Sequence, residues 1–196
     1  MARSSQYGFV FKRHLTPGIE TPATLEYIIS NSAGALTVGD AVYLSSGYLM
    51  GAGADQAILG ILVGFVTKNG ENIFKTEEAI SGSKSGDDTY NAAADNQTVD
   101  QVRGVVIVDT MALFQAHSDT ALVAADVGTF FNGGVADGTY VDSVVDSGSG
   151  AWSVGTQQFQ LIERVTTLED GSASTTAGLF RIIRSQLVHD VTQGAS

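Results

Sequence analysis

Three neighbouring stretches decide the fold: residues 36–44 read Leu-Thr-Val-Gly-Asp-Ala-Val-Tyr-Leu, residues 47–49 read Gly-Tyr-Leu, and residues 57–67 read Ala-Ile-Leu-Gly-Ile-Leu-Val-Gly-Phe-Val-Thr. Gly39-Asp40 and Ser45-Ser46-Gly47 are turn-forming residues, and the segments between them are β-branched, aromatic or aliphatic. The stretch from 35 to 67 therefore predicts strand, turn, strand, turn, strand, folded as a compact antiparallel meander. It offers no nucleophile beside a base, no set of metal ligands and no phosphate-binding loop.

The last strand of this stretch is apolar on both faces. Strict alternation places Ile58, Leu62 and Val66 on one face and Leu59, Ile61, Val63 and Phe65 on the other. A strand of this kind is covered on both sides, either by a second layer of the same chain or by a neighbouring chain.

More short strands are predicted along the rest of the chain, at residues 24–29, 102–108, 109–114, 138–145, 151–154, 157–166 and 178–191. Residues 109–114 are expected to continue or pair with the strand at 102–108, and 138–145 with 151–154 are expected to form a hairpin. In the last two strands, Phe159 alternates with Leu161 and Phe180 with Ile182. Residues 118–125 suit either a short helix, ended by Gly128, or a loop. Residues 68–101 are dominated by polar and turn-forming types and are expected to form an excursion or long loop. The resulting expectation is an all-β fold, a β-barrel or β-sandwich of short antiparallel strands with an extended N-terminal arm.

The arm is predicted to span residues 1–22, followed by a single β domain at residues 23–196. Pro17 and Pro22 are the only prolines in the chain, and they separate the arm from the first strand of the domain. The first 19 residues carry three basic residues and no acid, leaving seven basic residues against 21 acids in the remainder. The candidate partner-binding residues are Arg3, Tyr7, Phe9, Phe11, Lys12 and Arg13.

The sequence leaves three alternatives open for this arm. The arm frays in solvent, docks on an acidic neighbour, or lies back on its own domain. In the last case, deleting residues 1–15 would lower thermal stability by about as much as losing one peripheral strand.

Composition limits the class of protein. The 196 residues are 43% hydrophobic and only 16% charged, with a net charge of −11 and no cysteine. A strongly acidic chain lacks the clustered Lys and Arg that bind phosphates, so no nucleic-acid partner is expected. No apolar run is long enough for a signal sequence or a membrane span, so we expect no membrane partner and synthesis in a host cytoplasm.

Catalytic and metal-binding patterns are weak. His14, His117 and His189 lie far apart in the sequence, and none belongs to a zinc-binding motif. Asp87, Asp88, Asp95 and Asp100, with Asn91 and Asn96, lack the spacing of a calcium-binding loop and are expected to be solvated. We therefore expect no cofactor, no bound metal and no enzymatic activity.

Residues 37–44 and 57–64, followed by Ala-His-Ser-Asp-Thr at 116–120 and Ala-Asp-Val-Gly at 125–128, resemble sequences of small head proteins of tailed bacteriophages. The resemblance is closest to the capsid decoration, or cement, proteins. It implies a β-barrel-like body that binds the outer surface of an assembled shell, with the major capsid protein as its partner and a homo-oligomer, most often a trimer, as its state. The same residues leave two alternatives open: a carbohydrate-binding or host-adhesion module on a virion or cell surface, and a β-barrel hydrolase using paired carboxylates.

Overall fold

The computed structural model describes residues 8–30, 33, 35–53, 56–67, 89–91, 102–118, 120–135, 143–146 and 157–187. These residues form thirteen strands and one short 3₁₀ helix, which confirms the all-β expectation. The elements are β1 (Val10–His14), β2 (Thr24–Ile28), β3 (Ala35–Thr37), β4 (Ala41–Ser45), β5 (Tyr48–Gly51), β6 (Gly60–Thr67), β7 (Thr89–Asn91), β8 (Val102–Ile107), β9 (Ala112–His117), η1 (Ala124–Asp126), β10 (Phe130–Val135), β11 (Ser143–Asp146), β12 (Phe159–Arg164) and β13 (Ala177–Ile182).

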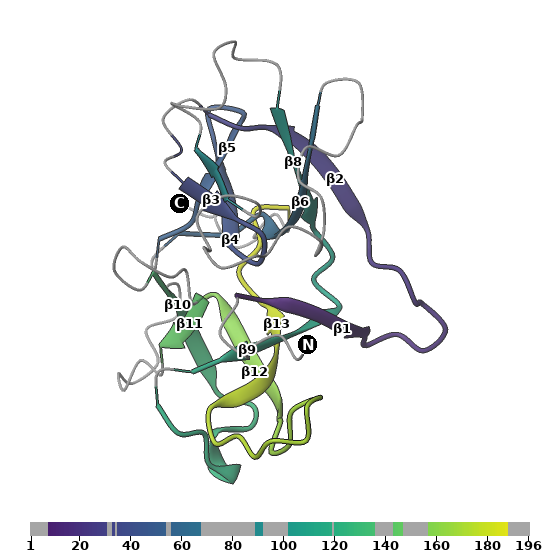
Figure 1. The fold of residues 1–196 in the computed structure, drawn as a ribbon, viewed down its shortest axis with the longest axis vertical. Helices are drawn as coiled ribbons and strands as arrows, with labels where there is room; N and C mark the ends of the chain where they lie inside the picture. Colours follow the sequence, from purple (N-terminus) through teal and green to yellow (C-terminus); the bar gives the residue numbers. More distant parts are fainter. Residues whose placement is uncertain are drawn as a thin grey trace, which may run out of the picture.

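One half of the molecule, drawn at the top of Figure 1, is a five-stranded antiparallel sheet in the order β2-β8-β6-β4-β5. Its two outer strands come together where Ile29, just after β2, forms a bridge with Leu49 of β5, and the N–H of Ser30 donates to the Leu49 carbonyl at 3.1 Å. The sheet therefore curls into a small barrel. Apolar side chains fill this barrel, and they are Ile29, Leu36, Val42, Leu49, Leu59, Leu62, Phe65, Val102, Val106 and Val108.

The predicted turns of the deciding stretch are confirmed, but the meander is not. Ser46 and Gly47 both have positive φ and join β4 to β5 as a tight hairpin. The next strand, β6, pairs with β4 instead of β5. The free edge of β5 is already used at Leu49 by the end of β2, so the chain has to return on the other side of β4.

A bulge in β6 changes which side chains face the barrel. The register against β8 shifts between Leu62 and Gly64, so that Leu62 and Phe65 both enter the barrel core while Val63 is 36% exposed. Strict alternation therefore assigns the faces wrongly beyond this point. Apart from Val63, the apolar residues at 58–66 are buried inside their own chain. The strand is therefore covered by other layers of the same chain, which was one of the two expected arrangements.

The other half is a six-stranded antiparallel sheet in the order β1-β9-β13-β12-β10-β11, curled so that β11 also contacts β9. Its core is rich in phenylalanine. The members are Phe9, Ala52, Ile58, Ile61, Ile107, Ala112, Phe114, Ala116, Leu122, Phe131, Phe159, Leu161, Phe180 and Ile182. Because Ala52, Ile58, Ile61 and Ile107 come from the barrel half, this core continues across the junction of the two sheets.

Polar contacts also join the two halves. Gln158, 1% exposed, donates from Nε2 to the carbonyls of Gly53 (2.8 Å) and Gln56, which lie between β5 and β6. After β13 the chain returns to the barrel, where the side chain of Gln186 bonds both the N–H (2.6 Å) and the carbonyl (3.1 Å) of Leu44. Side-chain amides thus connect backbone segments that no strand pairing connects.

Several local expectations changed. Residues 109–114 do not pair with the strand before them, because β8 belongs to the barrel and β9 to the six-stranded sheet. The helix considered at 118–125 is reduced to η1, and Gly128 follows it with a φ of +91°. The excursion at 68–101 lies outside the described residues except for β7, which pairs with β3. The hairpin partner at 151–154 also lies outside them, and β11 pairs with β10.

Candidate functional site

The N-terminal strand contains three of the six residues predicted to bind a partner, and a fourth directly precedes it. Arg3 and Tyr7 lie outside the described part of the chain. The other four are Phe9, Phe11, Lys12 and Arg13, and they lie on or beside β1, which pairs with β9 at the edge of the six-stranded sheet. The boundary drawn at residue 22 therefore does not separate β1 from the domain. For residues 9–14, the structure has the arm lying back on its own body.

Phe9 is the anchor of this strand. Its ring is 2% exposed, stacks on Phe159 with ring centroids 4.5 Å apart, and meets Phe114 edge-on at 6.3 Å. Phe11 also meets Phe114 edge-on, at 6.2 Å, from a partly buried position. The apolar residues expected to face a partner are thus part of the chain's own core, because an aromatic ring gains more from this burial than from exposure.

Gly8 and Gly39 bring the strand against the β3–β4 turn. The N–H of Phe9 donates to the Gly39 carbonyl at 2.9 Å. A Cβ atom on Gly8 would lie 2.7 Å from that same carbonyl oxygen, and Gly8 has a φ of +44°. The close approach therefore requires glycine at position 8 on both counts.

The two basic residues of β1 have acidic partners in the same domain. Lys12 pairs with Glu169, and Arg13 pairs with Glu163 at 2.5 Å. The hydrogen bond and charge of Lys12 lower the pKa of Glu169 below its usual value. Both basic residues of β1 are therefore paired with acids of their own domain, on the surface around β12 and the turn that follows it, as expected for an arm that lies back on its own body.

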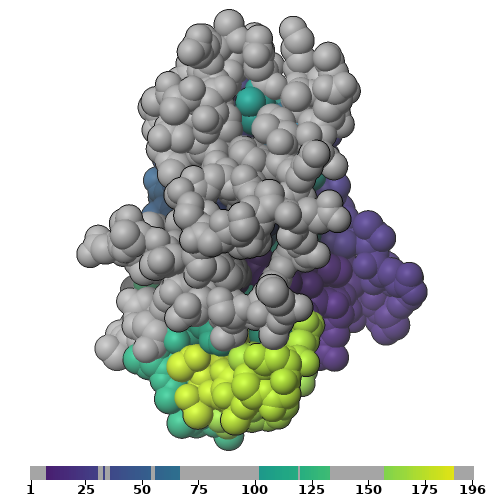
Figure 2. All heavy atoms as spheres, viewed as in Figure 1, coloured from purple at the N-terminus to yellow at the C-terminus, as the bar shows by residue number. Residues whose placement is uncertain are grey.

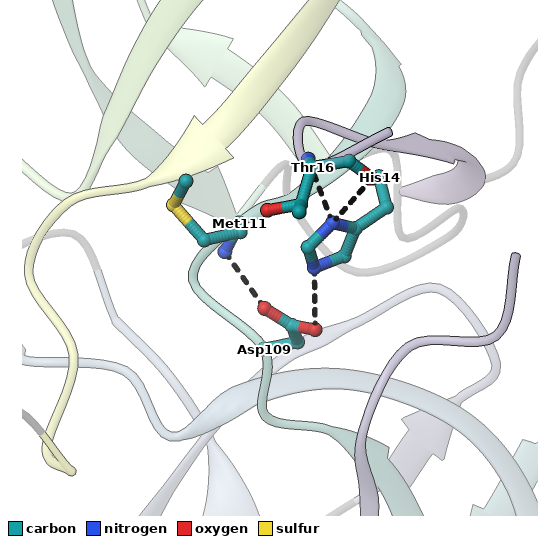
Figure 3. A network of polar contacts seen from close by, with 4 residues as sticks. All are labelled: His14, Thr16, Asp109 and Met111. Atoms are coloured by element: carbon teal, nitrogen blue, oxygen red, sulfur yellow. Dashed lines mark hydrogen bonds and ion pairs between the residues drawn. The ribbon is translucent and has the colours of Figure 1, made fainter. Parts of the chain in front are cut away.

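His14 closes the strand with a small polar network, shown in Figure 3. Its ring is buried, with Nε2 2.9 Å from Oδ2 of Asp109 and Nδ1 accepting the backbone N–H of Thr16 at 2.9 Å. Oδ1 of Asp109 accepts the N–H of Met111 at 2.9 Å. His14 and Asp109 thus join the end of β1 to the β8–β9 turn.

Asp40 is a buried carboxyl at the turn that holds Gly8 and Phe9. Its Oδ2 accepts the N–H of Thr37 at 2.8 Å, whereas Oδ1 has no hydrogen-bond partner among the described residues. Burial raises the pKa of Asp40 to about 7, partly offset by the bond from Thr37.

Beyond β1, the features that bear on function are metal-binding groups, membrane-spanning helices and the contacts of the other histidines and acids. These residues hold no group of three or more His, Asp or Glu side chains placed to bind a metal, and no helix among them is long and apolar enough to cross a membrane. His117 bonds the Thr176 hydroxyl at 3.0 Å, while His189 lies outside the described part. Asp87, Asp88, Asp95 and Asp100 lie outside it as well.

Comparisons with known proteins found no matching family model, no similar curated protein and no similar solved structure.

Sequence reasoning missed the role of Gly8, which lets the arm approach Gly39 closely. It also missed Asp109, Glu163 and Glu169 as partners of the arm. Gly8 carried a visible signal, because it stands between Tyr7 and Phe9 where a strand would favour a larger residue. The acids carried none. They lie far from β1 in the sequence, and only the pairing of β1 with β9 brings them near.

Proposed function

We propose that this chain is a structural protein of a bacteriophage virion that binds the outer surface of an assembled capsid and stabilises it. The observation that carries the proposal is the resemblance of residues 37–44 and 57–64 to capsid decoration proteins. Those residues supply the β3–β4 turn, β4 and β6, which are elements of the barrel and its core. The resemblance therefore concerns the body of the protein, and it assigns no contact residue on the surface.

The proposed partner is the major capsid protein, and the proposed state is a homo-oligomer, with a trimer favoured. Several weak contacts to a repeating shell add up to strong attachment, so the role requires adhesive surface and no reacting groups. The low charged fraction of 16% suits a subunit that covers part of its surface with neighbours. Strand β6, which is apolar on both faces, gives no support for an oligomer, because other parts of the same chain cover it.

Arg3 and Tyr7 remain the predicted contacts to the shell from the arm. Phe9 and Phe11 contribute to attachment only by fixing β1 on the six-stranded sheet. Deleting residues 1–7 removes the first pair and leaves β1 in place, which separates a contact role of the arm from a folding role.

The test is co-sedimentation with purified phage heads that lack this protein. Full-length protein is expected to bind in a saturable manner and to raise the temperature at which the heads rupture, while the variant lacking residues 1–7 binds more weakly at unchanged fold. The double variant Lys12→Gln with Arg13→Gln is the matched control. It removes positive charge from β1, as the truncation removes the positive charge of Arg3, but it leaves residues 1–7 in place. Absence of binding to heads contradicts the proposal, and binding to glycans instead would favour the adhesion alternative.

A further inference from the structure

Most contacts that hold β1 are made with the six-stranded half of the molecule, the exception being the bond from the Phe9 N–H to the Gly39 carbonyl of the barrel half, whereas the chain continues into the barrel half. The strand pairs with β9, its charged side chains reach Glu163 and Glu169, and Phe9 enters the phenylalanine core. The next strand, β2, belongs to the barrel. The site that receives β1 is therefore an edge of the six-stranded sheet, and the chain links β1 to the barrel only through the connection at residues 15–23.

This connection projects from the body. In Figures 1 and 2 it forms the purple loop that stands out at the side of the molecule. Residues 16–21 are all exposed, and Ile19 is an exposed apolar residue within them. Both prolines of the chain lie at its ends, Pro17 and Pro22, and they disfavour compact helical conformations of the residues before them. A loop of this kind can straighten without losing core contacts.

We propose that β1 is exchanged between copies of this chain, so that residues 8–14 of one copy add to β9 of a second copy in place of that copy's own β1. The second copy is the occupant because it offers every partner that β1 has in its own chain. These are the β9 edge, the Phe114 and Phe159 rings, the Gly39 carbonyl, Asp109, Glu163 and Glu169. The exchange deepens the proposed function by giving the arm a partner within an oligomer, but it does not depend on a capsid.

Exchange preserves these contacts and changes only the connection. Within one copy, the short linker gives β1 a high effective concentration at its own site, which favours the unexchanged form in dilute solution. Prolines restrict the linker and reduce the entropy it gains or loses on straightening. High concentration, and fixed neighbours in an assembly, therefore shift the balance toward exchange.

The Lys12–Glu169 ion pair supplies a direct test in the wild-type protein. Unlabelled and ¹⁵N-labelled chains are mixed in denaturant, refolded together at the highest soluble concentration, and treated with a carbodiimide that joins an amine directly to a neighbouring carboxylate. Mass spectrometry of the linked peptide containing residues 12 and 169 then reports whether the two came from one chain or two. The variant Glu169→Gln is the control, because it must remove this linked peptide.

We expect about half of the linked peptides to carry one labelled and one unlabelled member at full exchange, since neighbours are then drawn at random from equal pools. Linked peptides with only uniform labelling would overturn the proposal. Light scattering on the untreated protein is the second measurement, and a monomer at every concentration would also overturn it. Mixed labelling without head binding would retain exchange and remove the proposed function, and head binding with uniform labelling would do the reverse.

Discussion

At the scale of single residues, Asp40 has a buried carboxyl group whose Oδ1 has no hydrogen-bond partner in the part of the chain that the structure describes. The same residue belongs to the turn whose Gly39 carbonyl accepts the N–H of Phe9. Ionisation of Asp40 would leave a charge in a site without a counterion among the described residues, which is costly in an apolar environment. The protonation state of this carboxyl is therefore linked to the stability of the turn that receives the N-terminal strand.

We predict that Asp40 makes the protein less stable as the pH rises. The pKa is about 7 in the folded state against an ordinary value of 3.8, so the folded protein holds this proton more tightly than the unfolded chain. The resulting stabilisation is fully present below pH 3.8 and is lost as the pH passes through about 7. At about 1.4 kcal/mol per pKa unit, the difference between the folded and unfolded pKa values of Asp40 corresponds to roughly 4 kcal/mol in the free energy of unfolding.

The variant Asp40→Asn should lack this dependence, because the amide keeps an acceptor for Thr37 and cannot ionise. Urea unfolding over a range of pH compares it with wild type, and Glu20→Gln, at an exposed carboxylate, is the control. Parallel stability profiles for wild type and Asp40→Asn would mean that Asp40 does not titrate in this range.

Gly8 gives a second residue-scale prediction. Gly8→Ala is expected to cost more stability than Gly18→Ala, although both glycines have positive φ, +44° and +85°. An alanine Cβ at position 8 would lie 2.7 Å from the Gly39 oxygen, whereas nothing lies within 4 Å of one at position 18. Gly18→Ala should cost about 1 kcal/mol from backbone strain. Denaturant unfolding measures both, and equal losses would show that the close approach to Gly39 relaxes freely.

At the scale of elements, β1 belongs to the six-stranded sheet and is fastened at both ends. Phe9 holds its start in the core, and the contacts of His14 hold its end against the β8–β9 turn. The exposed ion pairs of Lys12 and Arg13 add little, because solvent screens them. The strand is thus fixed mainly by buried aromatic surface and by its backbone ladder.

Two truncations separate the roles of the N-terminal residues. Deleting residues 1–15 should lower the free energy of unfolding by at least about 3 kcal/mol, the usual cost of removing one buried phenylalanine. Deleting residues 1–7 should leave stability nearly unchanged, because β1 and Phe9 remain. Thermal and urea unfolding of both variants measure this, and equal stability of the longer truncation and the full-length protein would contradict the placement of β1.

At the scale of the whole molecule, the two curled sheets behave as one body because a shared core and two side-chain amides, buried Gln158 and exposed Gln186, join them. Gln158→Glu should cost at least about 2 kcal/mol, since the amide nitrogen that donates to the carbonyl oxygens of Gly53 and Gln56 becomes a carboxylate oxygen that repels them. Gln160→Glu is the matched control two residues along β12. The Nε2 of Gln160 also donates to one carbonyl, that of Gly128 at 2.9 Å, but its side-chain oxygen accepts from Arg181 at 2.8 Å, so a carboxylate there has a cation beside it and should cost less. Similar unfolding curves for the two variants would show that the amide of Gln158 does not join the halves.

The sequence alone determined those features that depend on neighbours in the chain. The turns at Gly39-Asp40 and at Ser46-Gly47 follow from residues that tolerate positive φ or bond their own backbone. The alternation of Phe159 with Leu161 and of Phe180 with Ile182 was enough to indicate strands with one buried face, and all four side chains lie in the core.

Only the tertiary structure decided which strands pair and where the arm lies. The bulge in β6, the return of that strand to β4 and the closure of the barrel through Ile29 and Leu49 depend on contacts between segments far apart in the chain. The same holds for β1, because local sequence marks Phe9, Lys12 and Arg13 as adhesive without naming their partners. Their partners, Phe159, Glu169 and Glu163, come within reach only when β9, β12 and β13 have formed a sheet.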